Sequence, residues 1–167
     1  MHSSFSATFD VVRKQLGFFG AWEITLQVIE KMKYNCLGLV DGNNLDEKLK
    51  NLEKTSLFNE IKLERLSENR LVFKVDRCDL AGGEEGIHLK ILKNKMEVPC
   101  PLVIAVAAYL KKSYPDKLLY VYPTVFTEWS SSTEIEILTP EKYNEKKENL
   151  RELARFEVEK ILSRKTG

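Results

Sequence analysis

The sequence predicts a single α+β domain spanning residues 1–167, in which a four-stranded antiparallel sheet built from two hairpins packs with about four helices. Residues 59–78 and 117–138 alternate apolar and polar side chains with the period of a strand. Three longer segments repeat apolar residues with the period of a helix. With 167 residues and 43% hydrophobic content, the chain can form one core. Helices on one side of the sheet would make a two-layer domain.

The first helix is predicted over residues 4–32, where Ser4 or Ser6 would cap it by accepting from free backbone N–H groups. Gly17 and Gly20 weaken its middle, which predicts a break, a close helix–helix contact, or room for a ligand to approach closely. Its apolar residues recur roughly at helical spacing: Phe9, Val12, Leu16, Phe19, Ile24, Val28 and Ile29.

A second helix is predicted over residues 43–58, with Asn43 or Asn44 as its cap. The first hairpin follows over residues 59–78, with Ser-Glu-Asn as its turn. Residues 79–95 begin with a glycine-rich loop and continue as a short helix or an irregular segment. The run from Pro101 to Tyr114 is apolar nearly all round, which predicts a helix buried on most sides.

The second hairpin spans residues 117–138, and its turn is expected at Ser130–Ser132. Pro123 cannot donate to a sheet ladder, so it predicts an edge or a bulge. The last helix is predicted over residues 140–164 with Thr139 as its cap. It carries an apolar stripe that would cover the sheet or a partner subunit: Tyr143, Leu150, Leu153, Ala154, Val158, Ile161 and Leu162.

Charge and cysteine content argue against several classes of protein. Lys and Arg number 26 and Asp and Glu number 25, so composition predicts neither a nucleic-acid partner nor an anionic membrane surface. The three cysteines, Cys36, Cys78 and Cys100, are an odd number at wide spacing, which favours reduced thiols. No run reaches the roughly 18 apolar residues of a membrane span, and no signal peptide is recognisable. We therefore expect a cytoplasmic protein, whose many Lys and Glu residues would suit a thermophile.

Motifs for catalysis are weak in this sequence. The glycines of residues 81–86 match neither a P-loop nor a dinucleotide-binding fingerprint. Cys100 and His88 would make a nucleophile and base pair if the fold brought them together. Cys78, His88 and Cys100 also suit zinc, although their spacing matches no known zinc knuckle. The alternative is that the two cysteines are small apolar packing residues.

Three stretches make the chain similar to the 4-vinyl reductase domain, also called the hydrocarbon-binding domain. This family shares its broader fold with haem nitric-oxide-binding domains and with vesicle-tethering subunits. The stretches are LGFFGAWEITLQVIEKM (16–32), ENRLVFKVDRC (68–78) and VPCPLVIAVAAYLKKSYPDKLLYVYPTVFTEWSSSTEIEIL (98–138). The resemblance covers about residues 5–138, and its motif-like part is Cys100-Pro101 at the start of the internal helix.

The resemblance implies a domain, often dimeric, that senses or carries small hydrophobic or heterocyclic molecules. Family members of the regulator type hold zinc through cysteines at the Cys-Pro motif and in the last hairpin. Here the resemblance reaches only Cys100, because Trp129 and residues 130–133 stand where the other cysteines would be. Zinc is therefore the one cofactor suggested, with Cys78, His88, Cys100 and Glu128 as the available ligands.

The expected function is binding of a small hydrophobic ligand between the helices and the sheet, without catalysis. The predicted ligand-binding residues are mostly aromatic, because such pockets are largely apolar: Phe19, Trp22, Cys100, Tyr109, Tyr122 and Trp129. The alternative for the aromatic residues is that they fill the core. Two other functions stay open: an enzyme or enzyme subunit of tetrapyrrole reduction, for which no flavin, nicotinamide or iron–sulfur motif is found, and a homodimeric assembly module.

Overall fold

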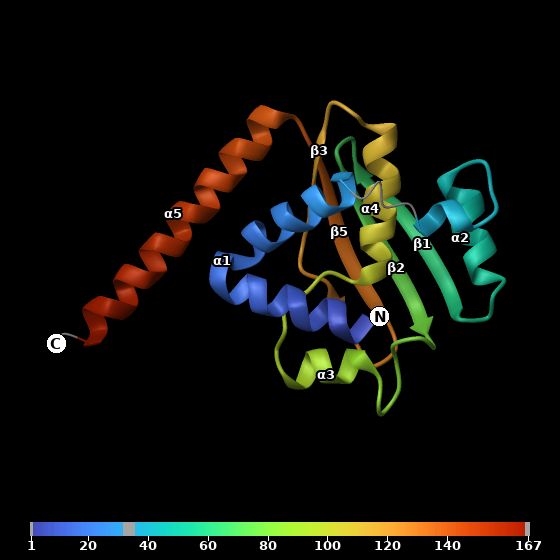
Figure 1. Ribbon diagram of the computed structural model, residues 1–167, viewed down its shortest axis with the longest axis horizontal. Coiled ribbons are helices and arrows are strands. Elements are labelled where there is room, and N and C mark those ends of the chain that lie inside the picture. Colours follow the sequence, from blue (N-terminus) through green and yellow to red (C-terminus); the bar gives the residue numbers. More distant parts are fainter. Residues whose placement is uncertain (1, 32–35, 166–167) are drawn as a thin grey trace.

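The computed structural model describes residues 2–31 and 36–165, with side chains described at 4–31, 37–150 and 152–153, and its fold is α+β as predicted. This part of the chain contains five α-helices, one short 3₁₀-helix and five strands. In chain order (Figure 1) they are α1 (His2–Lys31), η1 (Cys36–Leu39), α2 (Leu45–Glu53), β1 (Phe58–Ser67), β2 (Arg70–Cys78), α3 (Ile87–Lys93), α4 (Pro101–Ser113), β3 (Leu118–Val121), β4 (Val125–Phe126), β5 (Ser131–Leu138) and α5 (Pro140–Lys165).

The five strands form one antiparallel sheet in the order β1–β2–β5–β3, and β4 also pairs with β5. β3 pairs with residues 135–138 of β5 and β4 pairs with residues 131–132, so the two short strands share the position of the predicted fourth strand. Pro123 lies between them, at the edge where a residue without an N–H is tolerated. The sheet thus has one strand more than expected because the proline divides one strand.

The turn of the second hairpin is displaced from its predicted place. The Thr127 N–H donates to the Ser130 carbonyl at 2.9 Å, so the turn spans residues 127–130. Ser131 and Ser132 belong to β5, and Ser131 is buried. The run of serines suggested a turn, but its alternate residues follow the pleat of the strand instead.

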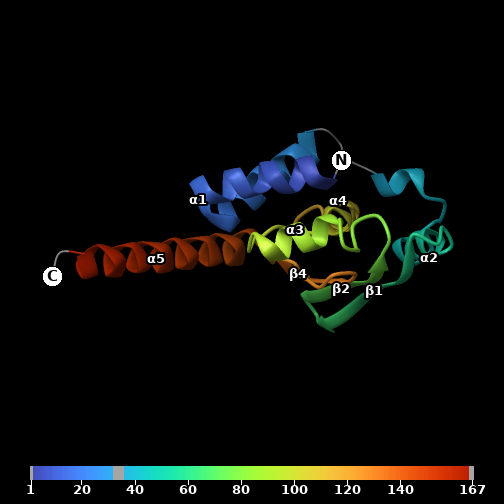
Figure 2. The same ribbon diagram turned by 90° about the horizontal axis from the view of Figure 1, so that it is seen from below.

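The helices α3 and α4 lie against one face of the sheet, and α1 lies beyond them on the same side (Figure 2). This arrangement explains why α4 is buried nearly all round, as its sequence predicted. Alternate strand residues point to this side and form the core with α4: Leu71, Phe73, Val75, Leu119, Val121, Thr133 and Ile135.

Side chains from two helices bond to backbone groups at the two edges of the sheet. At one edge the Trp22 Nε1–H donates to the Leu119 carbonyl of β3 at 2.8 Å. At the other edge the Ile61 N–H of β1 donates to the Glu53 carboxylate, at the end of α2, at 2.6 Å. Each edge strand therefore has a backbone group that a helix already satisfies.

The helix α1 is bent into two arms at Gly17, as its glycines allowed. Gly17 has φ 72° and ψ 170°, a combination essentially restricted to glycine. The arms diverge from this point in Figure 1. The helix begins at His2, earlier than predicted, so Ser4 and Ser6 lie inside it and neither is its N-terminal cap.

The predicted caps of α2 and α5 are confirmed. The Asn44 Oδ1 accepts from the Glu47 N–H at 2.9 Å, and the Thr139 Oγ1 accepts from the Lys142 N–H at 3.3 Å. α2 ends at Glu53, well before the predicted residue 58, because the chain enters β1 at Phe58. The ambiguous segment before α4 is the helix α3.

The helix α5 projects from the rest of the molecule (Figures 1 and 2). Of its predicted apolar stripe, Tyr143 is buried and Leu150 is half-buried, whereas Leu153 is 61% exposed. The side chains of Ala154, Val158, Ile161 and Leu162 lie outside the described residues. No helix of the described chain has the length and apolar character that crossing a membrane requires.

Candidate functional site: an apolar cavity under the bent helix

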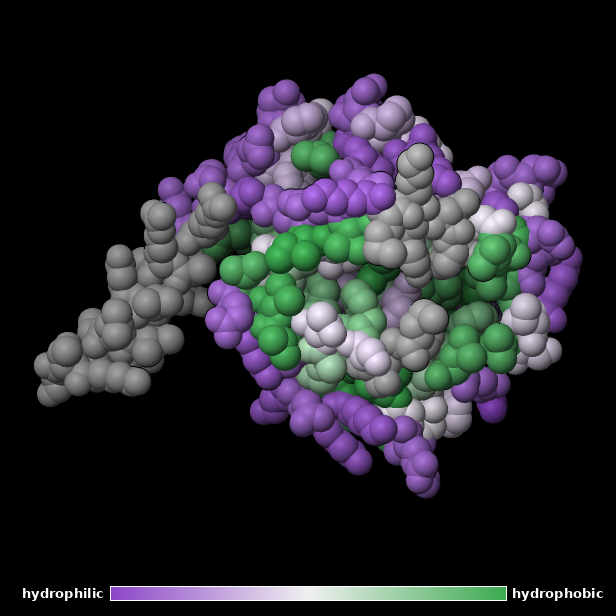
Figure 3. Space-filling view, in the orientation of Figure 1, coloured by the Kyte–Doolittle hydropathy of each residue, from purple (hydrophilic) through white to green (hydrophobic). Residues whose placement is uncertain are grey.

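A cavity of about 610 Å³ lies between α1, α3 and α4 and the nearby parts of β1, β2, β4 and β5. Its volume falls within the range of ligand pockets, roughly 300–1,000 Å³. Ile24, Val28, Leu57 and Leu80 line it and also reach the surface. Figure 3 shows apolar residues around a recess on this face. The cavity is thus an apolar site with an opening to solvent.

Both arms of α1 form one wall of the cavity. Phe5, Ser6 and Phe9 come from the first arm, and Ile24 and Thr25 come from the second. The two arms can face the same space because the chain reverses at Gly17. The backbone conformation at this position is essentially restricted to glycine. The fold therefore builds this wall from a single bent helix.

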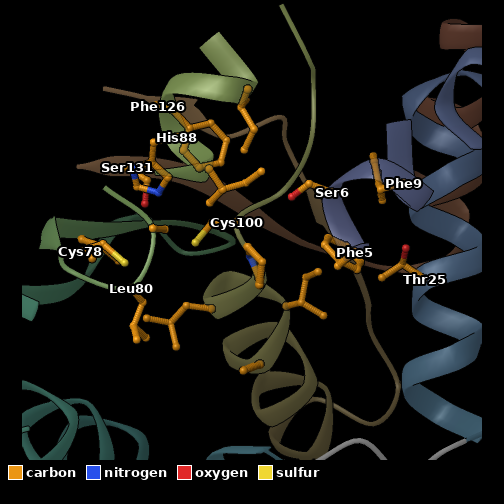
Figure 4. Close-up of a pocket in the computed structure, with 18 of the residues that line it drawn as sticks. Phe5, Ser6, Phe9, Thr25, Cys78, Leu80, His88, Cys100, Phe126 and Ser131 are labelled. Carbon is orange, nitrogen blue, oxygen red and sulfur yellow. The ribbon is translucent and has the colours of Figure 1, made fainter. Parts of the chain in front are cut away.

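The opposite wall contains two cysteines, a histidine and a serine (Figure 4). Cys78 ends β2, His88 lies in α3, Cys100 precedes α4 and Ser131 begins β5. The His88 ring packs on Phe126, with 4.9 Å between ring centroids.

Buried threonines hold Cys100 in place at the start of α4. Its backbone N–H donates to the Thr124 Oγ1 at 2.7 Å, and that oxygen is 2.6 Å from the Thr133 Oγ1. Pro101 at the first helical position lacks an N–H that would need a partner there. Cys100 is thereby positioned with its side chain in the cavity wall.

Burial raises the pKa of both cavity thiols. For Cys78 the nearby Cys100 adds to this rise, whereas for Cys100 backbone N–H groups and the Ser131 hydroxyl act in the opposite direction without reversing it. The thiol is the protonated form and the thiolate is the nucleophile, so a raised pKa makes these cysteines poor nucleophiles at neutral pH. They act here as small apolar side chains.

Charged side chains do not take part in the cavity wall: none of its described lining residues is Asp, Glu, Lys or Arg. The Thr25 hydroxyl donates to the Ala21 carbonyl within α1 at 2.9 Å. The Ser6 hydroxyl is 1% exposed and has no hydrogen-bond partner among the described residues. An almost wholly apolar space with a few polar atoms is the usual chemistry of a small-molecule site.

Of the six predicted ligand-binding residues, Cys100 lines the cavity and five lie elsewhere. Phe19 and Tyr122 belong to what we term the outer cluster, which gathers around β3 and the first turns of α5, outside the cavity lining: Phe19, Tyr120, Tyr122, Glu136, Tyr143 and Lys146. Phe19 stacks on Tyr120 with 5.3 Å between centroids. Tyr122 and Tyr120 alternate along β3 and its continuation with the inward-facing Leu119 and Val121, which turns both tyrosines away from the cavity.

The other three predicted residues lie outside the cavity lining and contact other parts of the fold. Trp22 is fully buried and bonds to β3 as described above. Tyr109 is half-buried on α4 and packs against the core. Trp129 lies in the hairpin turn, where its ring contacts Gly82 and Gly83 and lies 5.2 Å below the Arg77 guanidinium.

The predicted metal ligands are only partly brought together. Cys78, His88 and Cys100 share the cavity, but Glu128 lies exposed in the turn before β5. Among the residues with described placement, no group of three or more His, Cys, Asp and Glu side chains could hold a metal ion. Zinc binding therefore has no described ligand group to support it and stays a prediction, and Cys78 and Cys100 contribute two buried thiols to the wall.

Sequence reasoning missed the first arm of α1 as a source of cavity residues. Phe5 and Phe9 are four positions apart, so they share one helical face, and Ser6 lies beside them. That spacing could have identified the face. Nothing in the sequence shows that Ser6 lacks a partner, because this depends on what lies across the cavity.

A comparison of the chain with models of protein families, with curated proteins and with solved structures finds no match, so the family resemblance stays a prediction.

Proposed function

We propose that this chain is a ligand-binding domain that holds a small apolar molecule in the cavity under α1, as a sensor or carrier. The observation that carries the proposal is the cavity of about 610 Å³ with its apolar lining and surface opening. A packed protein interior contains few voids larger than a water molecule, so a space of this size calls for an occupant.

The properties of the wall favour binding over catalysis. Burial keeps both thiols protonated, and the described lining contains no carboxylate or lysine to act as a base. The imidazole in this lining, His88, packs its ring on Phe126. Binding would draw on the area of apolar surface removed from water, about 25 cal/mol per Å².

Thermal denaturation with added ligands tests this function. The neutral fluorophore phenylnaphthylamine and a panel of alkanes, alcohols and aromatic hydrocarbons would be added to the full chain. A ligand present at a hundred times its Kd stabilises the folded state by about 2.7 kcal/mol, which a rise in Tm reports. Unchanged Tm and unchanged reporter fluorescence across the whole panel would contradict the proposal.

A second candidate function is assembly of two copies through α5. Figures 1 and 2 show this helix extending from the body, and Leu153 on it is 61% exposed. An unsupported helix is only marginally stable in water, because most helical stability comes from packing. A second copy would supply that packing, and a net charge of +1 sets no strong repulsion between copies.

Light scattering on the full chain tests the assembly. Leu153→Glu places a charge on the exposed apolar position and should shift a dimer to the monomer mass at equal concentration. Asn144→Glu adds the same charge nine residues away, on the opposite side of the helix, and should leave the mass unchanged. A wild-type chain that is already monomeric at high concentration rules out this candidate.

A further inference from the structure

The Ser6 hydroxyl is a buried polar group without a partner inside an apolar site. It is 1% exposed, and its oxygen has no hydrogen-bond partner within the described residues. Figure 4 shows this oxygen turned towards the space between α1 and Cys100. Leaving a buried hydroxyl unsatisfied is unfavourable, and buried polar groups in native proteins nearly always have partners.

One neighbouring hydroxyl in the wall is already occupied, because Thr25 donates to the Ala21 carbonyl at 2.9 Å. The Ser131 hydroxyl acts to lower the pKa of the Cys100 thiol, against the larger effect of burial. Ser6 differs because α1 offers it no such bond. Its hydroxyl is thus available to a molecule in the cavity, as both donor and acceptor.

The absence of Asp, Glu, Lys and Arg from the described lining side chains limits what that molecule is. An ionised carboxylate, phosphate or amine would lose its hydration without gaining an opposite charge, which is strongly unfavourable. A neutral hydroxyl or carbonyl group needs only one hydrogen bond to be accommodated. The remaining surface of the ligand meets aliphatic and aromatic side chains.

We propose that Ser6 is the polar anchor of the cavity and that its ligand is an uncharged lipophile whose hydroxyl or carbonyl group hydrogen-bonds to the Ser6 Oγ. This inference rests on the proposed binding function and names the chemical class of the ligand. The volume corresponds to on the order of twenty water molecules at about 30 Å³ each, so a chain of octanol length fits.

Displacement of phenylnaphthylamine from the full chain by octanol and by nonane tests the anchor. The two probes have the same number of non-hydrogen atoms and differ by one hydroxyl. Ser6→Ala should weaken octanol binding about fivefold, the usual effect of one neutral hydrogen bond, and should leave nonane binding unchanged. The comparison variant Thr25→Val removes a hydroxyl whose proton is already donated to the Ala21 carbonyl, so it should change the octanol-to-nonane affinity ratio less than Ser6→Ala does.

The Tm of ligand-free Ser6→Ala is a second readout. Removing an unsatisfied hydroxyl should hold or raise the Tm, whereas a structural role for Ser6 predicts a fall. A third arm needs no variant: octanoate at pH 8, where it is ionised, should bind at least tenfold more weakly than octanol to the wild-type chain, because the described wall contains no lysine or arginine.

The outcomes separate the two proposals. Suppose that octanol and nonane bind, but Ser6→Ala weakens both to the same extent or weakens neither. The anchor is then wrong and the binding function stands, and the same holds if octanoate binds as tightly as octanol. A fall in the Tm of ligand-free Ser6→Ala also contradicts the anchor. If neither the reporter nor any probe binds, the binding function fails and the anchor fails with it.

Discussion

The cavity under α1 and the outer cluster beside β3 both contain aromatic side chains, but their polar atoms differ in how they are hydrogen-bonded. In the outer cluster the Lys146 ammonium donates to the Tyr122 hydroxyl at 2.7 Å and to the Glu136 carboxylate at 2.9 Å, and Tyr122 donates to Glu136 at 3.0 Å. In the cavity wall the buried Ser6 hydroxyl has no hydrogen-bond partner among the described residues. A bonded, packed region holds α5 on the sheet, and an unfilled region is open to a ligand.

Contacts between Lys146 and two tyrosine rings add to the packing of the outer cluster. The Lys146 ammonium lies 4.7 Å from the ring centroids of both Tyr120 and Tyr122, which favours a cation on the ring faces. Burial raises the pKa of Tyr120 to about 12, so its hydroxyl stays neutral. The comparison indicates that substitutions in the outer cluster change stability, and substitutions in the cavity change binding.

The largest expected effect comes from substituting two alanines on α4. Ala105 lines the cavity, whereas Ala108 is equally buried but lies outside its wall. Ala108→Phe should destabilise the fold by about 1–3 kcal/mol because a packed core has no room for the ring. Ala105→Phe should place its ring in the cavity at little cost and abolish binding of phenylnaphthylamine.

Urea denaturation and reporter fluorescence of both variants provide the measurements. Equal destabilisation by the two substitutions would show that the space beside Ala105 is filled in solution.

Glu136→Gln should have a smaller effect, confined to stability. It replaces the carboxylate that Lys146 and Tyr122 contact with a neutral amide. The Lys146 and Glu136 side chains are both partly exposed, so solvent screens the attraction between them. We expect a loss of about 1 kcal/mol by urea denaturation at pH 7 and an unchanged affinity for phenylnaphthylamine. A matched loss of reporter affinity would break the separation between the two regions.

The pH dependence of that loss is the smallest predicted effect. Burial opposes ionisation of Glu136, but the hydrogen bonds from Lys146 and Tyr122 outweigh it and lower the pKa of the carboxyl group. The stabilisation is therefore fully present above the unfolded-state pKa of about 4.3 and disappears as pH falls through the lowered value. The difference in unfolding free energy between wild type and Glu136→Gln should shrink below about pH 4. A difference that grows on acidification would contradict the assigned shift.

Much of the fold could be predicted because single residues decide it locally. Gly17 and Pro123 remove conformations or donors that other residues have, so the break in α1 and the interruption of the edge strand follow from their chemistry. The apolar run after Pro101 likewise predicted a buried helix. These features depend on short stretches of chain and survive without knowledge of the tertiary structure.

The candidate site was harder to predict because it depends on which face each side chain takes. The aromatic residues of the second hairpin were expected in the cavity, yet the period-two alternation of Leu119, Tyr120, Val121 and Tyr122 places the tyrosines outside. Applying that alternation would have moved Tyr122 to the outer face. The lack of a hydrogen-bond partner for Ser6 is different, because it depends on the residues across the cavity and no sequence pattern indicates it.

The helix side chains at the two edges of the sheet have a consequence for how copies of the chain can associate. Unprotected edge strands invite pairing with a strand of another molecule, which leads to open-ended fibres. Here the Trp22 indole occupies the Leu119 carbonyl and the Glu53 carboxylate occupies the Ile61 N–H, so an incoming strand would have to displace a helix side chain at either end. These two bonds therefore disfavour continuous β-ribbons formed by edge-to-edge pairing of sheets.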